Sequence, residues 1–259
     1  MGAQSGNVAG LPSFTQTGTG EPLVLLMGLG AAGEKWAPHI DAWSERFRCI
    51  AIDNRGFGGT VDDGGPLSVE LMAADVARVV DALDLGPVRV AGISMGSAIA
   101  QQLMIDRPEL VSKAVLVATW SATPPSLGYF FRSVAGIAGH RDPQLLRLLL
   151  QQFTWTPEWN DAHADEAERM IDDPAPIPFS TLERQAEACA AFDVSDRLSG
   201  VTVPTLVTYG KTDLLIRPQL SQRTAELIPG AEAIAFETGH VHHWEELDVF
   251  NKRVLEWLG

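Results

Sequence analysis

Residues 88–102 read VRVAGISMGSAIAQQ, and this stretch decides the fold. Val88–Ile93 is an apolar run of strand length, and the small residues that follow favour a helix. The turn between them carries Gly92, Ser94 and Gly96, which is the GxSxG pattern in a strand-to-helix context. Strand and helix approach so closely at such a turn that a Cβ at either glycine would collide with the chain. We therefore expect Ser94 to occupy a strained turn that exposes its hydroxyl group in front of a helix N-terminus.

A serine hydroxyl is a poor nucleophile near neutral pH, so it needs a base that is itself oriented by an acid. The strand predicted at Thr205–Tyr209 leads into Asp213, and the strand predicted at Ala231–Phe236 leads into His240. Open α/β sheets bind their ligands at the carboxyl ends of strands. The order Ser94, Asp213, His240 is also the chain order of the triad in α/β-hydrolases.

Neighbouring side chains offer alternatives for the base and the acid. His242 and His243 lie close to His240, but only His240 directly follows the glycine of the loop after the strand. Asp193 and Asp196 precede the Thr205 strand and are expected to cap or pair locally. We assign roles on the surface or in the helical insertion to the three remaining histidines, His39, His140 and His163.

The rest of the chain alternates apolar runs of strand length with amphipathic segments of helix length, which is typical of a mostly parallel sheet covered on both faces. Strands are expected at Leu23–Met27, Cys49–Ile52, Val88–Ile93, Ala114–Ala118, Thr205–Tyr209 and Ala231–Phe236. Helices are expected at Ala37–Arg46, Val69–Leu85, Met95–Arg107, Pro218–Leu227 and Trp244–Leu258. Strand patterning is absent from Ser121 to Ser195, so we predict a core of residues 1–120 and 196–259 with a helical cap inserted at 121–195. Within the cap, residues 145–153 are apolar nearly all round and predict a helix packed on both sides.

These motifs resemble those of α/β-hydrolase-fold enzymes with a helical cap, a family of esterases, lactonases and cofactor-free haloperoxidase-like or perhydrolase-like proteins. The resemblance extends from Glu21 to Leu258 and includes residues 53–58, DNRGFG, similar to DxRGxGxS, and residues 239–245, GHVHHWE, similar to GHxxxxE. It implies an oxyanion hole built from the backbone N–H groups of Leu29 and Met95. Where the family often has His-Gly, this chain has Met27 before its glycine, which removes a polar side chain that supports the oxyanion loop. A serine at position 94 argues against the members that use a carboxylate nucleophile, the epoxide hydrolases and haloalkane dehalogenases.

A dinucleotide site is the competing interpretation of the first glycine-rich turn. Residues 28–33, GLGAAG, match GxGxxG, and Asp53 follows twenty residues after Gly33. However, Pro38 places the first helical turn beyond the glycines, and Asp53 leads into another glycine-rich loop. An NAD(P)-binding oxidoreductase is therefore the weaker alternative, together with a non-catalytic binding module.

Composition excludes several classes of partner. The chain of 259 residues carries 19 Lys and Arg against 33 Asp and Glu, a net charge of −14, which argues against nucleic acid and anionic membranes. Cys49 and Cys189 form no CxxC pattern, and the acidic stretch 161–173 has the irregular spacing of a solvated helix face, so we expect no metal and no cofactor. The apolar stretch Pro22–Gly33 lacks a preceding basic residue and is too short for a membrane span, so we expect a cytoplasmic location.

Together these patterns predict a serine hydrolase that cleaves a small or medium carboxylic ester or lactone through an acyl-enzyme on Ser94. The cap holds five arginines against eleven acidic residues, which favours a largely neutral substrate. Four aromatic residues of the cap are candidates for the substrate pocket: Phe130, Phe131, Trp155 and Trp159. Hydrolysis of a C–C bond, perhydrolysis and a cyclase or lyase reaction on the same fold stay open, as does the oligomeric state.

Overall fold

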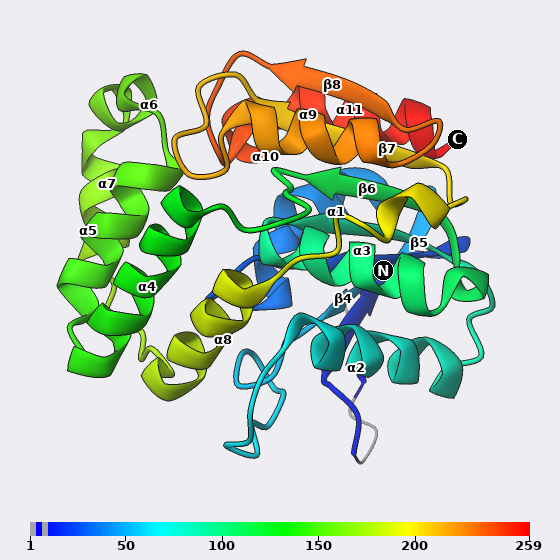
Figure 1. Ribbon diagram of the computed structural model, residues 1–259, viewed down its shortest axis with the longest axis horizontal. Coiled ribbons are helices and arrows are strands. Elements are labelled where there is room, and N and C mark those ends of the chain that lie inside the picture. The colour runs from blue at the N-terminus through cyan, green and yellow to red at the C-terminus, as the bar shows by residue number, and fades with distance from the viewer. Residues whose placement is uncertain (1–3, 7–9) are drawn as a thin grey trace.

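A mostly parallel β-sheet forms the centre of the protein in the computed structural model, which describes residues 4–6 and 10–259 (Figure 1). The described residues form eight strands in the order β1-β2-β4-β3-β5-β6-β7-β8. Their bounds are β1 Gln4–Gly6, β2 Phe14–Thr17, β3 Glu21–Leu26, β4 Phe47–Ile52, β5 Val88–Ile93, β6 Val111–Val117, β7 Thr205–Gly210 and β8 Glu232–Phe236. Strands β1 and β2 pair antiparallel with their neighbours, and every pairing from β4 to β8 is parallel.

The six predicted strands are all present, with ends that differ by at most a few residues. The sequence did not predict β1 or β2. Strand β2 is only four residues long, and of these only Phe14 is buried. Such a short segment lacks the apolar run that marked the inner strands.

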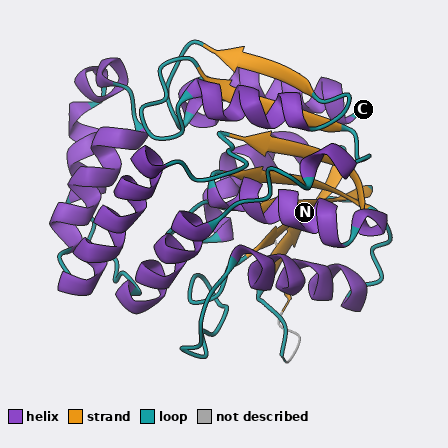
Figure 2. Ribbon diagram, viewed as in Figure 1, coloured by secondary structure: helices purple, strands orange, loops and turns teal. Residues whose placement is uncertain are grey.

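Alternating side chains of the inner strands serve two different cores. Leu23 and Leu25 pack in a cluster with Trp36 and Phe250, whereas Val24 packs on the opposite face of the sheet. Helices α1 (Ala37–Trp43) and α11 (Leu247–Leu258) cover the first face, and α2 (Val69–Ala82), α3 (Met95–Asp106) and α9 (Pro218–Leu227) cover the second (Figure 2). Short helices complete the core: η1 (Gly33–Trp36), η2 (Pro108–Leu110), η3 (Leu198–Gly200) and α10 (His242–Glu245). The helix predicted at Trp244–Leu258 is thus divided into α10 and α11.

Five α-helices lie between β6 and β7, and we call them the helical insertion: α4 (Pro125–His140), α5 (Pro143–Thr154), α6 (Pro157–Ala162), α7 (Ala164–Ile171) and α8 (Phe179–Ala191). An isolated bridge between Ala122 and Asp193 holds the entering and leaving chain together. Proline occupies the first turn of α4, α5 and α6, where its missing N–H has no helical partner in any case. The insertion stands at one end of the core, with α8 reaching back toward it (Figure 1).

Helix α5 corrects one expectation. The sequence predicted a helix packed on both sides, but Leu145 is 50% and Leu148 is 47% exposed. Only Leu146 and Gln151 of this helix are buried. Helix α5 is therefore partly exposed to solvent, although most of its side chains are apolar. In the described part of the chain, no helix is both long and apolar enough to cross a membrane.

A buried histidine corrects a second expectation. The sequence predicts a place on the surface or in the insertion for His39, yet it is fully buried in the first core, where its Nδ1 lies 2.7 Å from Oδ1 of Asn251 on α11. Its ring stacks on that of His243, with centroids 5.3 Å apart. Burial lowers the pKa of His39 to about 4 and that of His242 to about 3, and it lowers the pKa of His243 well below the ordinary value.

We predict that the protein loses stability as the pH falls from about 6.5 to about 4. In this pH range the histidines of the unfolded chain become protonated, whereas the buried histidines of the folded protein stay neutral. His39 alone should lower the free energy of unfolding by on the order of 3 kcal/mol across this window. Urea denaturation at several pH values should give a shallower pH dependence for His39→Gln than for the wild type. The exposed His140→Gln is the control, and equal slopes for wild type and His39→Gln would contradict the prediction.

Candidate active site

Ser94 occupies the turn between β5 and α3 with φ 51° and ψ −120°, a conformation that few residues other than glycine adopt. A Cβ at Gly92 would lie 2.2 Å from the carbonyl oxygen of Gly96, and a Cβ at Gly96 would lie 2.1 Å from that of Leu26. Both distances are well inside van der Waals contact. The predicted requirement for glycine at both positions is therefore confirmed.

Asp213 and His240 meet at the same end of the sheet. Asp213 follows β7, and its Oδ2 lies 2.9 Å from Nδ1 of His240, which follows β8. The other carboxylate oxygen accepts hydrogen bonds from the backbone N–H groups of Leu215 and Ile216, each at 2.8 Å. A carboxylate only accepts hydrogen bonds, so Nδ1 of His240 carries the proton and Nε2 is left as the accepting nitrogen.

Backbone contacts hold the loop after β7 against the loop after β8. A Cβ at Gly210, the last residue of β7, would lie 2.1 Å from the carbonyl oxygen of Gly239. The N–H of Thr212 donates to the carbonyl oxygen of Thr238 at 3.1 Å. The loops that carry Asp213 and His240 are therefore in backbone contact at Gly210 and at Thr212.

None of the alternative side chains forms a pair like that of His240 and Asp213. His242 is fully buried with its Nε2 3.0 Å from Oγ1 of Thr208, and His243 is buried in the aromatic cluster beside α11. Asp193 accepts hydrogen bonds from the residue two positions further on, as the sequence suggested, and Asp196 is exposed.

A cavity of about 220 Å³ lies in front of Ser94 and His240. Three of the four predicted aromatic residues line it, namely Phe130, Phe131 and Trp155. The fourth, Trp159, is not among its lining residues and instead stacks on Trp155 with ring centroids 3.8 Å apart. The sequence missed further lining residues: Met27, Ile93, Leu150, Thr154, Leu215, Val241, His243 and Trp244. Met27 and Ile93 end predicted strands, which is the signal that would have found these two.

The loop of residues 27–33, which we call the Gly28 loop, passes directly over Ser94. A Cβ at Gly28 would lie 3.3 Å from the Cβ of Ser94, and Leu29 lines the cavity. Met95 is the first residue of α3, and its side chain is fully buried in the core. The N–H of a first helical residue has no partner within its own helix.

Asp53, the acid of the dinucleotide pattern, is occupied within the fold. One carboxylate oxygen accepts a hydrogen bond from the N–H of Gly33 at 2.8 Å, and the other accepts from Oγ of Ser13 at 2.6 Å and from the N–H of Gly59 at 3.0 Å. These contacts join three loops. They give the conspicuous spacing between Gly33 and Asp53 a structural role that needs no nucleotide.

Glu245, the last residue of the GHVHHWE segment, ties the helical insertion to the loop of His240. Its two carboxylate oxygens accept hydrogen bonds from the N–H and Oγ of Thr156, at 3.0 and 2.7 Å. Burial raises the pKa of Glu245, against the opposing effect of these hydrogen bonds. The N–H of Val241 also donates to the carbonyl oxygen of Thr154 at 3.3 Å. The insertion is therefore anchored beside the histidine.

Neither the acidic stretch nor the cysteines form a further site in the described part of the chain. No group of three His, Cys, Asp or Glu side chains there is placed to hold a metal ion, residues 161–173 included. Cys49 and Cys189 are both free and buried, and burial raises the pKa of Cys49 to about 12. A thiol with so high a pKa is unreactive.

Comparison with known proteins places this arrangement in a family. The model of the alpha/beta hydrolase fold matches residues 21–247. The chain belongs to the α/β-hydrolase family. The predicted fold and family are thereby confirmed.

Two curated relatives match nearly the whole chain. A protein of Azorhizobium caulinodans named as a carbamate hydrolase, RutD, is 32% identical over 246 residues, covering 93% of this chain and 92% of its own. A protein of Mycobacterium tuberculosis named as a non-heme bromoperoxidase, BpoC, is 30% identical over 255 residues, covering 95% and 97%. Among solved structures, the enol-lactonase of Burkholderia xenovorans LB400 superposes with a TM-score of 0.89 at 24% identity, covering 98% of this chain and 99% of that one. The last likeness supports the α/β-hydrolase fold alone.

We predict that Gly96→Ala lowers the free energy of unfolding by about 3 kcal/mol or prevents folding, because its Cβ would displace the backbone of β3. The matched control is Gly136→Ala on the exposed side of α4, where a Cβ meets nothing within 4 Å. That change should stabilise the protein by about 0.5–1 kcal/mol through helix propensity. Thermal and urea unfolding measure both, and wild-type stability of Gly96→Ala would refute the close approach.

Proposed function

We propose that this protein is a serine hydrolase that cleaves small or medium, largely neutral carboxylic esters or lactones through an acyl-enzyme on Ser94. One observation carries the proposal: Ser94 and His240 line the same cavity, and the ring of His240 is held by Asp213 at 2.9 Å. A nucleophile, a base and an orienting acid are the components that acyl transfer requires.

In the proposed reaction, Oγ of Ser94 attacks the carbonyl carbon while Nε2 of His240 takes its proton. Asp213 keeps the imidazole oriented and stabilises its charged form. The N–H groups of Leu29 and Met95 bind the oxyanion. His240 then gives the proton to the leaving alcohol, and the acyl group stays on Ser94. Water, deprotonated by His240, attacks the acyl carbon and releases the acid, and the returning proton restores Ser94.

The cavity supports a compact and mostly apolar substrate. Its volume of about 220 Å³ is below the range of about 300–1,000 Å³ that pockets for larger ligands occupy. Phe130, Phe131 and Leu150 supply apolar walls from the helical insertion, which we propose to be a cap spanning residues 121–195 over a core of residues 1–120 and 196–259. The cap's excess of six acidic residues over arginines disfavours strongly anionic substrates.

Two relatives favour neighbouring activities of the same site. The likeness to the protein named as a carbamate hydrolase favours carbamates as additional acyl substrates. The likeness to the protein named as a non-heme bromoperoxidase favours perhydrolysis, in which hydrogen peroxide replaces water as the second nucleophile. Both reactions would use the same nucleophile and base.

We predict that a fluorophosphonate probe labels the protein on Ser94 and that Ser94→Ala abolishes labelling. His240→Ala should lower kcat for p-nitrophenyl butyrate by on the order of 10⁴-fold, because the hydroxyl then has no base. Ser133→Ala changes an exposed serine of the insertion and should label like the wild type. Intact labelling of Ser94→Ala, or no labelling of the folded wild type, would remove the basis for the proposal.

We also predict that kcat/KM is at least about tenfold higher for p-nitrophenyl butyrate than for its anionic analogue, mono-p-nitrophenyl succinate, because the acidic cap repels the free carboxylate. Added salt should narrow the difference by screening. Steady-state kinetics with both esters at low and high salt measure this. Equal turnover of the two esters at low salt would show that the charge of the cap does not select the substrate.

A further inference from the structure

The Gly28 loop needs support that its own side chains do not give. Met27, which stands where relatives often have histidine, cannot donate or accept a strong hydrogen bond. Nevertheless this loop carries Leu29, whose N–H is a proposed oxyanion donor. The fold supplies part of the support from the core, because Nδ2 of the buried Asn54 donates to the carbonyl oxygen of Met27 at 3.2 Å.

The second support comes from the helical insertion. Gln185 on α8 is fully buried, and its Oε1 accepts a hydrogen bond from the N–H of Gly30 at 3.1 Å. Its Nε2 donates to the carbonyl oxygen of Arg55 at 3.4 Å. One partner is a backbone donor and the other is a backbone acceptor, so the amide of Gln185 has only one orientation that satisfies both.

The conformation of Gly30 makes this contact specific. Gly30 has φ +75°, and a Cβ there would lie 3.0 Å from Cδ1 of Leu182, one turn before Gln185 on α8. The backbone of the Gly28 loop is therefore pressed against α8 at the residue whose N–H the glutamine accepts. A shift of α8 would therefore move the backbone at Gly30.

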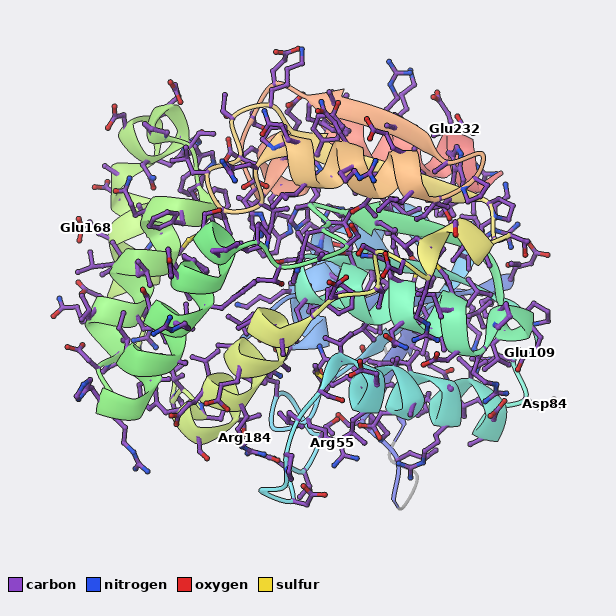
Figure 3. The ribbon with its side chains drawn as sticks, in the orientation of Figure 1. Arg55, Asp84, Glu109, Glu168, Arg184 and Glu232 are labelled. Atoms are coloured by element: carbon purple, nitrogen blue, oxygen red, sulfur yellow. The ribbon has the colours of Figure 1, made fainter. Side chains whose placement is uncertain are left out.

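Helix α8 is itself fixed on the core by charge. Arg184 pairs with Asp62, which also accepts a hydrogen bond from Thr181, and Arg184 donates to the carbonyl oxygen of Gly65 at 2.5 Å. Burial acts to raise the pKa of Asp62, but the hydrogen bonds from Arg184, Thr181 and a backbone N–H outweigh it and lower the pKa to about 2. The pair therefore stays ionised at any working pH. Figure 3 shows Arg184 beside the loop that carries Arg55.

We propose that Gln185 is a positioning residue: it holds the Gly28 loop in the conformation that the oxyanion hole requires, so the seating of the insertion sets the catalytic geometry. This inference rests on the proposed function. Gln185 touches no reacting atom and acts through Gly30, the residue next to Leu29. Loss of a single oxyanion donor lowers kcat by about 10²–10³-fold, and a displaced donor should cost less than a missing one.

Gln185→Met keeps the length and helix propensity of the side chain and removes both hydrogen bonds. We expect kcat for p-nitrophenyl butyrate to fall about 10- to 100-fold with KM changed less than about threefold, because the loss is confined to the transition state. The matched control is Gln151→Met, which removes the hydrogen bond of another buried glutamine of the insertion, to Asn160 at 2.7 Å, away from the Gly28 loop. It should leave both constants near wild type. A wild-type kcat for Gln185→Met, or an equal loss in Gln151→Met, would overturn the proposal.

A trifluoromethyl ketone separates positioning from a general structural role. Ser94 Oγ bonds to the ketone carbon, its proton passes to His240, and the carbonyl oxygen becomes an oxyanion that needs the hole. Affinity for this inhibitor should fall in Gln185→Met by the same factor as kcat/KM. Unchanged affinity alongside reduced kcat would overturn the positioning role.

Hydrogen exchange at Gly30 tests the contact without any substrate. The N–H of Gly30 should lose protection in Gln185→Met and keep it in Gln151→Met, and equal protection in both would overturn the inference. This readout distinguishes the two failures. If the wild type neither labels nor turns over esters, the proposed function fails; if it does both while Gln185→Met stays fully active, only the role of Gln185 fails.

Gln185→Glu provides a conservative rescue. The ionised carboxylate accepts from Gly30 but repels the carbonyl oxygen of Arg55, whereas the protonated acid restores both hydrogen bonds. Burial raises the pKa of an introduced carboxyl group, so activity relative to wild type should rise as the pH falls from about 8 to about 6. The relative activity of Gln185→Met should stay flat. A flat ratio for Gln185→Glu would contradict the hydrogen-bonding role.

Discussion

The structure depends on a contact between two backbone segments that leaves no room for a side chain. Gly96 at the start of α3 lies so close to Leu26 of β3 that a Cβ would be 2.1 Å from a carbonyl oxygen. This approach forces the sharp turn in which Ser94 has a positive φ. Such strain costs about 1–3 kcal/mol and persists only where the surroundings over-determine it. Here the surroundings are β5, buried between two parallel neighbours, and α3, of which ten residues are buried.

The same principle governs the other half of the site. A Cβ at Gly210 would collide with the backbone of Gly239, and the loops that contain these glycines carry Asp213 and His240. Because backbone contacts set these positions, the geometry does not depend on flexible surface side chains. The carboxylate of Asp213 receives two backbone N–H groups as well as the imidazole, so the acid of the proposed triad is fixed by the fold alone. Pre-organisation of this kind removes reorganisation from the reaction step.

Sequence reasoning succeeded where a feature is local. The turn at Ser94 and the inner strands are dense apolar or glycine patterns within a few residues, and they predicted the fold and the family. It failed where a residue's environment depends on a partner that is far away in the sequence. The burial of His39 depends on Asn251, 212 residues away, and the contact of Gln185 with Gly30 spans 155 residues. The prediction that α5 packs on both sides was wrong for a different reason: Leu145 and Leu148 are exposed despite their hydrophobicity.

The helical insertion touches both walls of the site. Gln185 contacts the Gly28 loop on one side of Ser94, and Thr156 is held by Glu245 in the segment that follows His240 on the other. Lining residues such as Phe130 and Trp155 come from the same insertion. The insertion therefore lines the cavity and also contacts the loops proposed to bind the oxyanion and to carry the base. Substitutions that resize the cavity by shifting α8 should then change the rate of reaction as well as the choice of substrate. Helix α4 takes no part in the contacts of Gln185 and Thr156. Substitutions on the face of α4 that lines the cavity can therefore change the choice of substrate alone.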